Sequence, residues 1–186
     1  MVYVAKADNI DPENPRQGFK PIPPGYYHVQ IEKMQEDEKK QAFVILTLTI
    51  IGVEKNASKE PIGENHREYI YFCDNSGDTK WADKKFTSIM YCCGLVTQDQ
   101  IRKFVASGNG VPILFDEMPG RTLVVKLSKK KDKDGNETQY NEVGLNWFPL
   151  DSKEAKLVDL HPSFANANAT PANDAQFQQA AADDLF

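Results

Sequence analysis

The stretch 121–133 carries a cluster of basic side chains: Arg121, Lys126, Lys129, Lys130, Lys131 and Lys133. The acids nearby are Asp132, Asp134 and Glu137. Basic side chains that gather in this way bind phosphates and displace counterions from nucleic acids. The same pattern occurs on solvated hairpins, where lysines only keep the surface soluble. The cluster therefore predicts an anion-binding surface only where other residues support it.

Aromatic side chains supply that support, because several are expected on the outward faces of strands. They are Tyr26 with His28 beside it, Phe43, Tyr69, Tyr71 and Tyr140. Flat rings stack on the exposed bases of a single strand, and each stacked base contributes roughly 1–3 kcal/mol. For any one ring, packing over an end of the fold is an equal alternative. Phe43 and Trp81 are weaker candidates, and the helical neighbours of Trp81 place it in the core.

Motifs for catalysis are missing from the sequence. It contains no GxxxxGK[ST] phosphate loop, no GxSxG elbow, no HExxH pair and no strand-linked GxGxxG. The histidines and cysteines lack the paired spacing of structural zinc sites, and neighbouring Cys92 and Cys93 on a helix would point about 100° apart. The cysteines are therefore expected to be buried and structural. We predict a protein that is not an enzyme and needs no cofactor or metal.

Composition limits the architecture and the partners. A chain of 186 residues with 40% hydrophobic content can close one core and carry an appendage. The net charge is −5, and the segment from His161 to Phe186 holds three acids and no Lys or Arg. Three cysteines suit a reducing compartment, and no apolar run is long enough to cross a membrane. A cytoplasmic protein without membrane contacts is expected.

Hydrophobic periodicity predicts a mainly β chain with inserted helices. Alternation at every second residue indicates strands at 25–33, 43–53, 67–72, 121–131 and 139–148. In the last of these, Val143, Leu145 and Trp147 are expected to point inward. A spacing of three and four indicates helices at 81–93 and 97–106, the second capped by Thr97. Asp134-Gly135 predicts a hairpin between the last two strands.

This order of elements favours an OB-fold, a five-stranded barrel with helices between strands three and four. An unrelated α+β sandwich is the alternative. The expected organisation is an extended Pro-rich leader packing on the body (1–24), an OB-fold DNA-binding domain (25–150), a mostly disordered linker (151–182) and an acidic C-terminal interaction tip (183–186).

The amino-acid sequences of these segments are similar to those of a group of phage single-stranded-DNA-binding proteins. The resemblance covers about residues 21–148 and lies in the order of IPPGYYHVQI, FVILTLTIIGV, MPGRTLVVKL and YNEVGLNWF. The closing AAADDLF also resembles the acidic, aromatic-ended tails of bacterial and phage single-strand binders. The tip has only two adjacent acids and lacks the proline often found before the last Phe, which leaves the partner of the tail open.

The resemblance implies sequence-independent binding of single-stranded DNA in phage replication, recombination or repair, in the host cell cytoplasm. DNA would contact Tyr26, His28, Tyr69, Tyr71, Arg121, Lys126, Lys129, Lys130, Lys131, Lys133 and Tyr140. Replication or recombination proteins would bind the tail through Asp183, Asp184, Leu185 and Phe186, and the tail would compete with DNA. The alternative is an OB-like protein-interaction or recombination accessory module without direct DNA binding. The sequence does not decide between a monomer and a homodimer.

Overall fold

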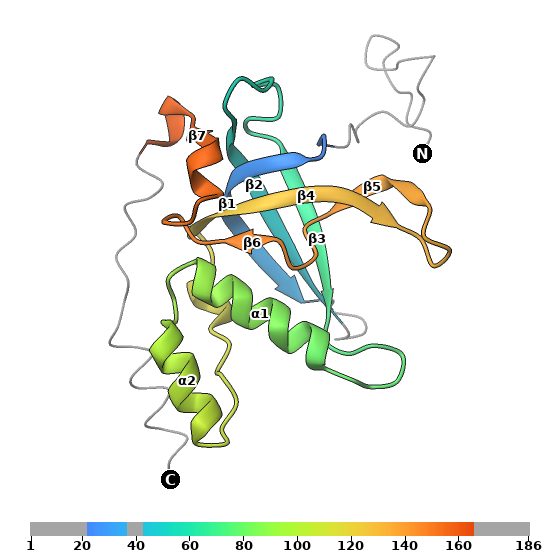
Figure 1. Cartoon of the computed structure of the whole chain (residues 1–186), viewed down its shortest axis with the longest axis vertical. Coiled ribbons are helices and arrows are strands. Elements are labelled where there is room, and N and C mark those ends of the chain that lie inside the picture. The colour runs from blue at the N-terminus through green and yellow to red at the C-terminus, as the bar shows by residue number, and fades with distance from the viewer. Residues whose placement is uncertain (1–21, 37–42, 166–186) are drawn as a thin grey trace, which may run out of the picture.

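The computed structural model describes residues 22–36 and 43–165 and shows a mainly β protein (Figure 1). Its strands are β1 (Gly25–Glu36), β2 (Phe43–Glu54), β3 (Asn65–Tyr71), β4 (Thr122–Lys131), β5 (Glu137–Glu142), β6 (Trp147–Phe148) and β7 (Val158–Leu160). Helices α1 (Lys80–Cys92) and α2 (Gln98–Ala106) follow β3 and precede β4. The predicted β class and the position of the helices are confirmed.

All strand pairs are antiparallel, in the order β3-β2-β1-β4-β5, while β6 pairs with β4 and β7 pairs with β2. Irregularities in the β1–β2 register after His28 and after Ile31 bend β1, as bulges do. Strands β3 and β5 end the path, and no pairing between them is found in the described residues. The sheet is therefore open, and the predicted five-stranded OB-fold barrel is not confirmed.

The core lies between the concave face of the sheet and helix α1, which crosses below the sheet in Figure 1. Alternate residues of β2 and β4, including Leu46, Leu48 and Leu123, are fully buried. Helix α1 adds Phe86 and Ile89 to the same cluster. Period-two strands and a period-3.6 helix thus supply the core, as the sequence predicted. The opposite side of the sheet is also buried in part, at Thr47, Ile51 and Val124.

Helix α2 lies at the periphery. Thr97 caps it as predicted, because its hydroxyl accepts from the backbone N–H of Gln100 and the Gln100 side chain accepts from the backbone N–H of Thr97. Ile101 and Phe104 pack partly on the core, but Val105 is exposed. Within the described residues, no helix is long and apolar enough to cross a membrane.

The predicted strand at 139–148 is interrupted. Gly144 has φ +62°, in the left-handed region that favours glycine, and this turn separates β5 from β6. Val143 and Trp147 are buried as expected, whereas Leu145 is exposed at the turn. The expectation of an inward Leu145 was wrong because the strand does not continue through it.

Residues 151–165, which the sequence placed in the linker, pack on the body instead. Within them, β7 pairs with the end of β2, Gly52–Glu54. A Cβ on Gly52 would lie 2.4 Å from the carbonyl oxygen of Asp159, so only glycine allows this approach. The body therefore extends to about Ala165, beyond the predicted boundary at 150.

The close approach of β7 to Gly52 also explains the position of His28. This residue pairs with Gly52 and Val124, and only 6% of it is exposed. Its Nε2 is buried without a hydrogen-bond partner among the described residues. Burial lowers the pKa of His28 from 6.5 to about 4. His28 is therefore a neutral packing residue, and its expected place on a DNA-binding surface is not supported.

This burial predicts a loss of stability in mild acid. Because the pKa of His28 is lower in the folded state, unfolding between pH 6.5 and pH 4 is accompanied by protonation of His28. The free energy of unfolding therefore keeps its full value above pH 6.5 and declines as the pH falls towards 4. The loss should reach about 2–3 kcal/mol at pH 4. Urea unfolding of the wild type and of His28→Phe at pH 7 and pH 4.5 measures it. Equal pH dependence of the two proteins would contradict the assignment.

Candidate nucleic-acid interface

The outward side of β2 and β3 presents a group of rings, here called the aromatic face and defined by Phe43, Tyr69 and Tyr71. Phe43 is paired with Tyr71, and Ile45 with Tyr69, so these side chains share one face. The ring centroid of Phe43 lies 5.3 Å from that of Tyr71 and 5.8 Å from that of Tyr69. Tyr69 is 48% exposed and Tyr71 57%. The two tyrosines are thus open to solvent and supported from one side by Phe43.

Two cationic side chains lie one row away on the same face. Thr47 of β2 is paired with Arg67 of β3 on one side and with Lys33 of β1 on the other. Both basic residues are exposed. The outward side of β1, β2 and β3 therefore combines open rings with positive charge.

A buried carboxylate connects this part of the sheet to the chain after β5. Glu68 points inward from β3, and its oxygens accept hydrogen bonds from the backbone N–H groups of Val143 (3.1 Å) and Gly144 (3.4 Å). Lys85 of α1 donates its Nζ to Glu68 at 2.6 Å, and His66 Nε2 lies 3.2 Å from the other oxygen. Glu68 thus bridges β3 to the β5–β6 connection where strand pairing is missing.

The charge state of Glu68 follows from these contacts. Burial raises the pKa of this carboxyl, but the hydrogen bond with His66 and the charge and hydrogen bond of Lys85 lower it, and the net shift is downward. Glu68 is therefore ionised at neutral pH. An ionised buried carboxylate with this many partners fixes the position of the surrounding elements.

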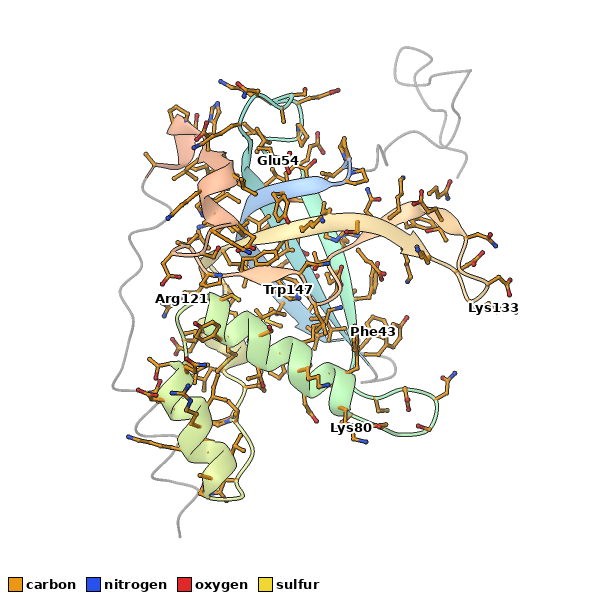
Figure 2. All side chains as sticks on the ribbon, viewed as in Figure 1. Phe43, Glu54, Lys80, Arg121, Lys133 and Trp147 are labelled. Atoms are coloured by element: carbon orange, nitrogen blue, oxygen red, sulfur yellow. The ribbon has the colours of Figure 1, made fainter. Side chains whose placement is uncertain are left out.

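The lysine hairpin, residues 129–133, lies at the turn between β4 and β5, and β5 ends just before the residues that contact Glu68. Lys129 is paired with Asn141, two residues before Val143, which corresponds to roughly 7 Å along a strand. The hairpin projects from the body on the side where β3 lies, and Figure 2 shows Lys133 at its far end and Phe43 on the same side of the molecule. The strand that carries the tyrosines and the chain that follows β5 are thus linked through Glu68.

The tip of the hairpin has the turn that the sequence predicted. The Asp132 carboxylate accepts from the backbone N–H groups of Asp134 and Asn136, both at 2.9 Å, and Gly135 has φ +85°. Lys130, Lys131 and Lys133 are exposed, and Lys129 is partly buried. Tyr140 is exposed on β5 of the same hairpin.

Tyr26 and Lys126 form a second, separate group. They are paired across β1 and β4, the Lys126 Nζ lies 5.3 Å from the centre of the Tyr26 ring, and Phe148 contacts that ring at 5.9 Å. Tyr26 also donates its backbone N–H to Glu54, at the end of β2, whereas Phe43 begins this strand. That separation is roughly 30 Å of extended chain. The structure does not bring Tyr26 to the aromatic face.

Arg121 and Trp81 are placed differently from expectation. Arg121 is 6% exposed and donates its Nε to the carbonyl of Glu117, so it holds the turn before β4 and does not offer its charge to a ligand. Trp81 was expected in the core but is 55% exposed, because the buried side of α1 is formed by Ala82, Phe86 and Ile89. Sequence periodicity could not show this, since Trp81 fits the apolar stripe of the helix.

The cysteines also differ from one another. Cys92 and Cys93 are buried, and burial raises the pKa of both thiols, to about 12 for Cys92. Cys73 is exposed, contrary to the expectation that all three are buried. Among residues 22–36 and 43–165, no group of three or more His, Cys, Asp or Glu is arranged to hold a metal ion.

Two predicted regions lie outside the described residues: the leader up to residue 21, and the tip formed by Asp183, Asp184, Leu185 and Phe186. The end of the leader is described from Ile22, which is buried in the core and whose carbonyl accepts from the Asn141 side chain.

Fold and surface together define a small protein with an open antiparallel sheet, two helices between β3 and β4, and an aromatic and cationic outer face. The chain belongs to a protein family of unknown function, DUF669, whose model matches residues 8–156. No match was found among curated proteins.

Proposed function

We propose that this protein binds single-stranded DNA without sequence preference and without catalysis, through the aromatic face and the lysine hairpin. The observation that carries the proposal is the exposure of Tyr69 and Tyr71 beside Arg67, on a strand tied by Glu68 to the hairpin. Following the resemblance to phage single-strand binders, the DNA would be an intermediate of phage replication, recombination or repair.

The chemistry of a single strand fits both parts of this surface. Unpaired bases offer flat faces for the two open tyrosine rings, and such stacking tolerates any base. Phosphates would contact Lys33 and Arg67 on the sheet and the lysines of the hairpin. Since the chain is acidic overall, with a net charge of −5, this local clustering must supply the attraction for DNA.

The element order supports an OB-like arrangement of this binding surface. In that fold, the face of strands two and three and the loops after strands one and four bind oligonucleotides. Here the aromatic face lies on β2 and β3, and the lysine hairpin is formed by the end of β4 and the loop after it. Strand β1 pairs with both β2 and β4, as the Greek-key order requires, although the sheet is open between β3 and β5.

Fluorescence anisotropy with a labelled oligothymidine of about thirty nucleotides tests the proposal. At low salt we expect a micromolar or lower dissociation constant for the oligothymidine, and weaker binding of double-stranded DNA of the same length. Absence of binding in these conditions would contradict the proposal and favour the alternative of a protein-interaction module.

The lysine hairpin should account for much of the salt dependence. Alanine at Lys129, Lys130, Lys131 and Lys133 removes up to four phosphate contacts. The slope of log K against log salt should then fall by up to about 2.8, since each contact to a single strand contributes about 0.7. Anisotropy titrations at several salt concentrations measure this slope.

A matched control separates local contacts from overall charge. Alanine at Lys55, Lys59, Lys153 and Lys156 removes the same charge from exposed positions in the β2–β3 loop and after β6. This control should keep the wild-type slope. If both quadruple variants lowered the slope equally, the effect would belong to net charge and the hairpin would lose its assigned role.

The acidic tip at Asp183, Asp184, Leu185 and Phe186 remains a proposal that rests on the resemblance. Its carboxylates and terminal ring suit a basic-rimmed pocket on a replication or recombination protein, and the same carboxylates would compete with DNA for the basic surface.

A further inference from the structure

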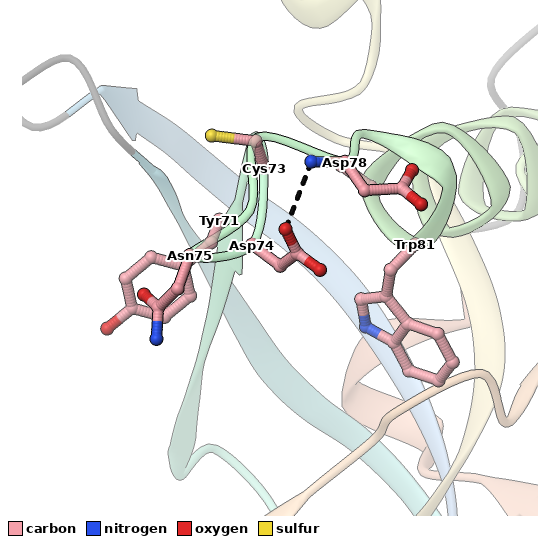
Figure 3. Close-up of a pocket in the computed structure, with 7 residues that line it drawn as sticks. Tyr71, Cys73, Asp74, Asn75, Asp78 and Trp81 are labelled. Carbon is pink, nitrogen blue, oxygen red and sulfur yellow. Dashed lines mark hydrogen bonds between the residues drawn. The ribbon is translucent and has the colours of Figure 1, made fainter.

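A pocket of about 370 Å³ lies between the end of β3 and the start of α1 (Figure 3). Six of its lining residues carry the argument: Tyr71, Cys73, Asp74, Asn75, Asp78 and Trp81. No pattern in the sequence indicates this pocket, because Tyr71 and Trp81 belong to different elements and the loop between them has no recognisable motif.

Two aromatic rings form opposite sides of this pocket. Figure 3 shows Tyr71 and Asn75 on one side, Trp81 on the other, and the Asp74 carboxylate between them. Tyr71 and Trp81 are both more than half exposed, so their rings are accessible to a ligand. The volume exceeds that of a nucleobase, and flat rings at the sides suit a flat ligand.

The position of Asp74 is fixed by its own loop. Its Oδ1 accepts hydrogen bonds from the Ser76 hydroxyl (2.6 Å), the Ser76 backbone N–H (2.8 Å) and the Asp78 backbone N–H (3.0 Å). These bonds, with the one from the Ser76 hydroxyl largest, lower the pKa of Asp74. The pocket therefore contains an ionised carboxylate, which accepts hydrogen bonds and donates none.

The pocket is continuous with the aromatic face. Tyr71 belongs to both, since it lines the pocket and lies 5.3 Å from Phe43. A DNA strand whose bases stack on Tyr69 and Tyr71 would therefore reach the pocket with its next base. The carboxylate of Asp74 repels phosphates, so a base can enter while the backbone must stay outside. The Asp78 carboxylate is paired with Lys80, 3.2 Å away.

We propose that this pocket receives one unstacked base of the bound strand, between Tyr71 and Trp81, and prefers bases with an exocyclic amino group over thymine. The inference rests on the proposed function: binding along the aromatic face and the hairpin has no sequence preference, and the pocket adds a preference at the single base that it holds. Cytosine presents its N4 amino group to a carboxylate, as in known readout by acidic side chains, whereas thymine presents a carbonyl oxygen at the same place. The Asn75 amide can pair with other groups on the edge of the base.

The fluorescence of Trp81 provides a direct test. The chain has two tryptophans, and Trp147 is buried while Trp81 is exposed. Stacking of a base on Trp81 should quench the intrinsic fluorescence of the wild type, and Trp81→Phe should lose this response. Anisotropy of a labelled oligonucleotide records binding independently in the same samples. Binding without quenching would overturn the pocket assignment and leave the proposed function intact, whereas absence of binding would overturn both.

Affinity measurements test the two parts of the inference. Trp81→Ala should weaken oligocytidine binding about 5- to 100-fold, and Tyr91→Ala, which removes an exposed ring from the same helix outside the pocket, should not. The wild type should bind oligocytidine severalfold more tightly than oligothymidine. Asp74→Asn keeps an acceptor for the loop but removes the charge, and should bring this ratio close to one. An unchanged ratio would refute the role of Asp74.

Aromatic sides and a carboxylate would also suit an arginine side chain of a partner protein. An arginine-containing peptide added to the wild type distinguishes the two ligands. If the peptide quenched Trp81 and oligonucleotides did not, the pocket would be a protein-binding site and the inference would be wrong.

Discussion

Replacing Tyr69 and Tyr71 together by alanine is expected to weaken oligothymidine binding by at least about 30-fold. Each ring should stack one base, and the loss of two stacked bases costs roughly 2–6 kcal/mol. Both side chains are exposed on β3, so their removal should change the melting temperature little. Anisotropy titrations give the affinity, and thermal unfolding shows that the fold is retained.

Two controls make this expectation specific. Phenylalanine at both positions keeps the rings and should keep most of the affinity, because stacking uses the ring and not the hydroxyl. Tyr91→Ala removes an exposed ring of α1 and should bind as the wild type does. Full binding by the double alanine variant would show that DNA, if bound, does not use the aromatic face.

Removal of the Glu68 carboxylate should have the largest effect on stability. In Glu68→Ala, the buried Lys85 loses the carboxylate with which it forms an ion pair, and the backbone N–H groups of Val143 and Gly144 lose their acceptor. Breaking a buried pair in this way costs about 3–5 kcal/mol. Urea unfolding at pH 7 measures the change. Adding Lys85→Met should recover part of the loss, because it removes the uncompensated charge, and strictly additive losses would contradict the pairing.

The pH dependence of this effect has a defined sign. The pKa of Glu68 is lowered in the folded state, so its contribution is complete above the ordinary value of 4.5 and is lost as the pH falls through the lowered value. Glu68→Gln should flatten the stability profile below pH 4.5. It should also loosen the hairpin relative to β3, since Glu68 is the bridge between them.

Local patterns predicted much of the fold. The alternation in β3 separated Ile70, which is buried, from Tyr69 and Tyr71, which are exposed. Thr97 was identified as a cap from its position, and Asp134-Gly135 as a hairpin turn. These features depend only on residues that are close together in the sequence, and local patterns can therefore predict them.

Features that depend on distant segments were not predicted. His28 alternates like an outward residue, but β7, three residues long and without a period of its own, covers it across Gly52. The Glu68 bridge joins residues 75 positions apart, and no local signal indicates it. For the same reason the Tyr71–Trp81 pocket was missed, although both residues were identified as aromatic.

The candidate site was predicted in its chemistry but not in its extent. Tyr69 and Tyr71 are exposed, as are Lys130, Lys131 and Lys133 of the hairpin, and their use as one DNA-binding surface stays a prediction. Tyr26 and Lys126 lie at the other end of β2, since β1 pairs with β4 at its beginning and with the start of β2 only at its end. A strand assignment gives the face of a residue, whereas its distance from another residue depends on register.

The most direct test of DNA binding by the aromatic face is a map of backbone amide shifts in the ¹⁵N-labelled full chain during titration with oligothymidine. We expect the largest shifts around Arg67, Tyr69 and Tyr71, with further shifts in the hairpin from Lys129 to Lys133 and small ones around Tyr26. Shifts confined to other surfaces, or no shifts at saturating oligonucleotide, would contradict it.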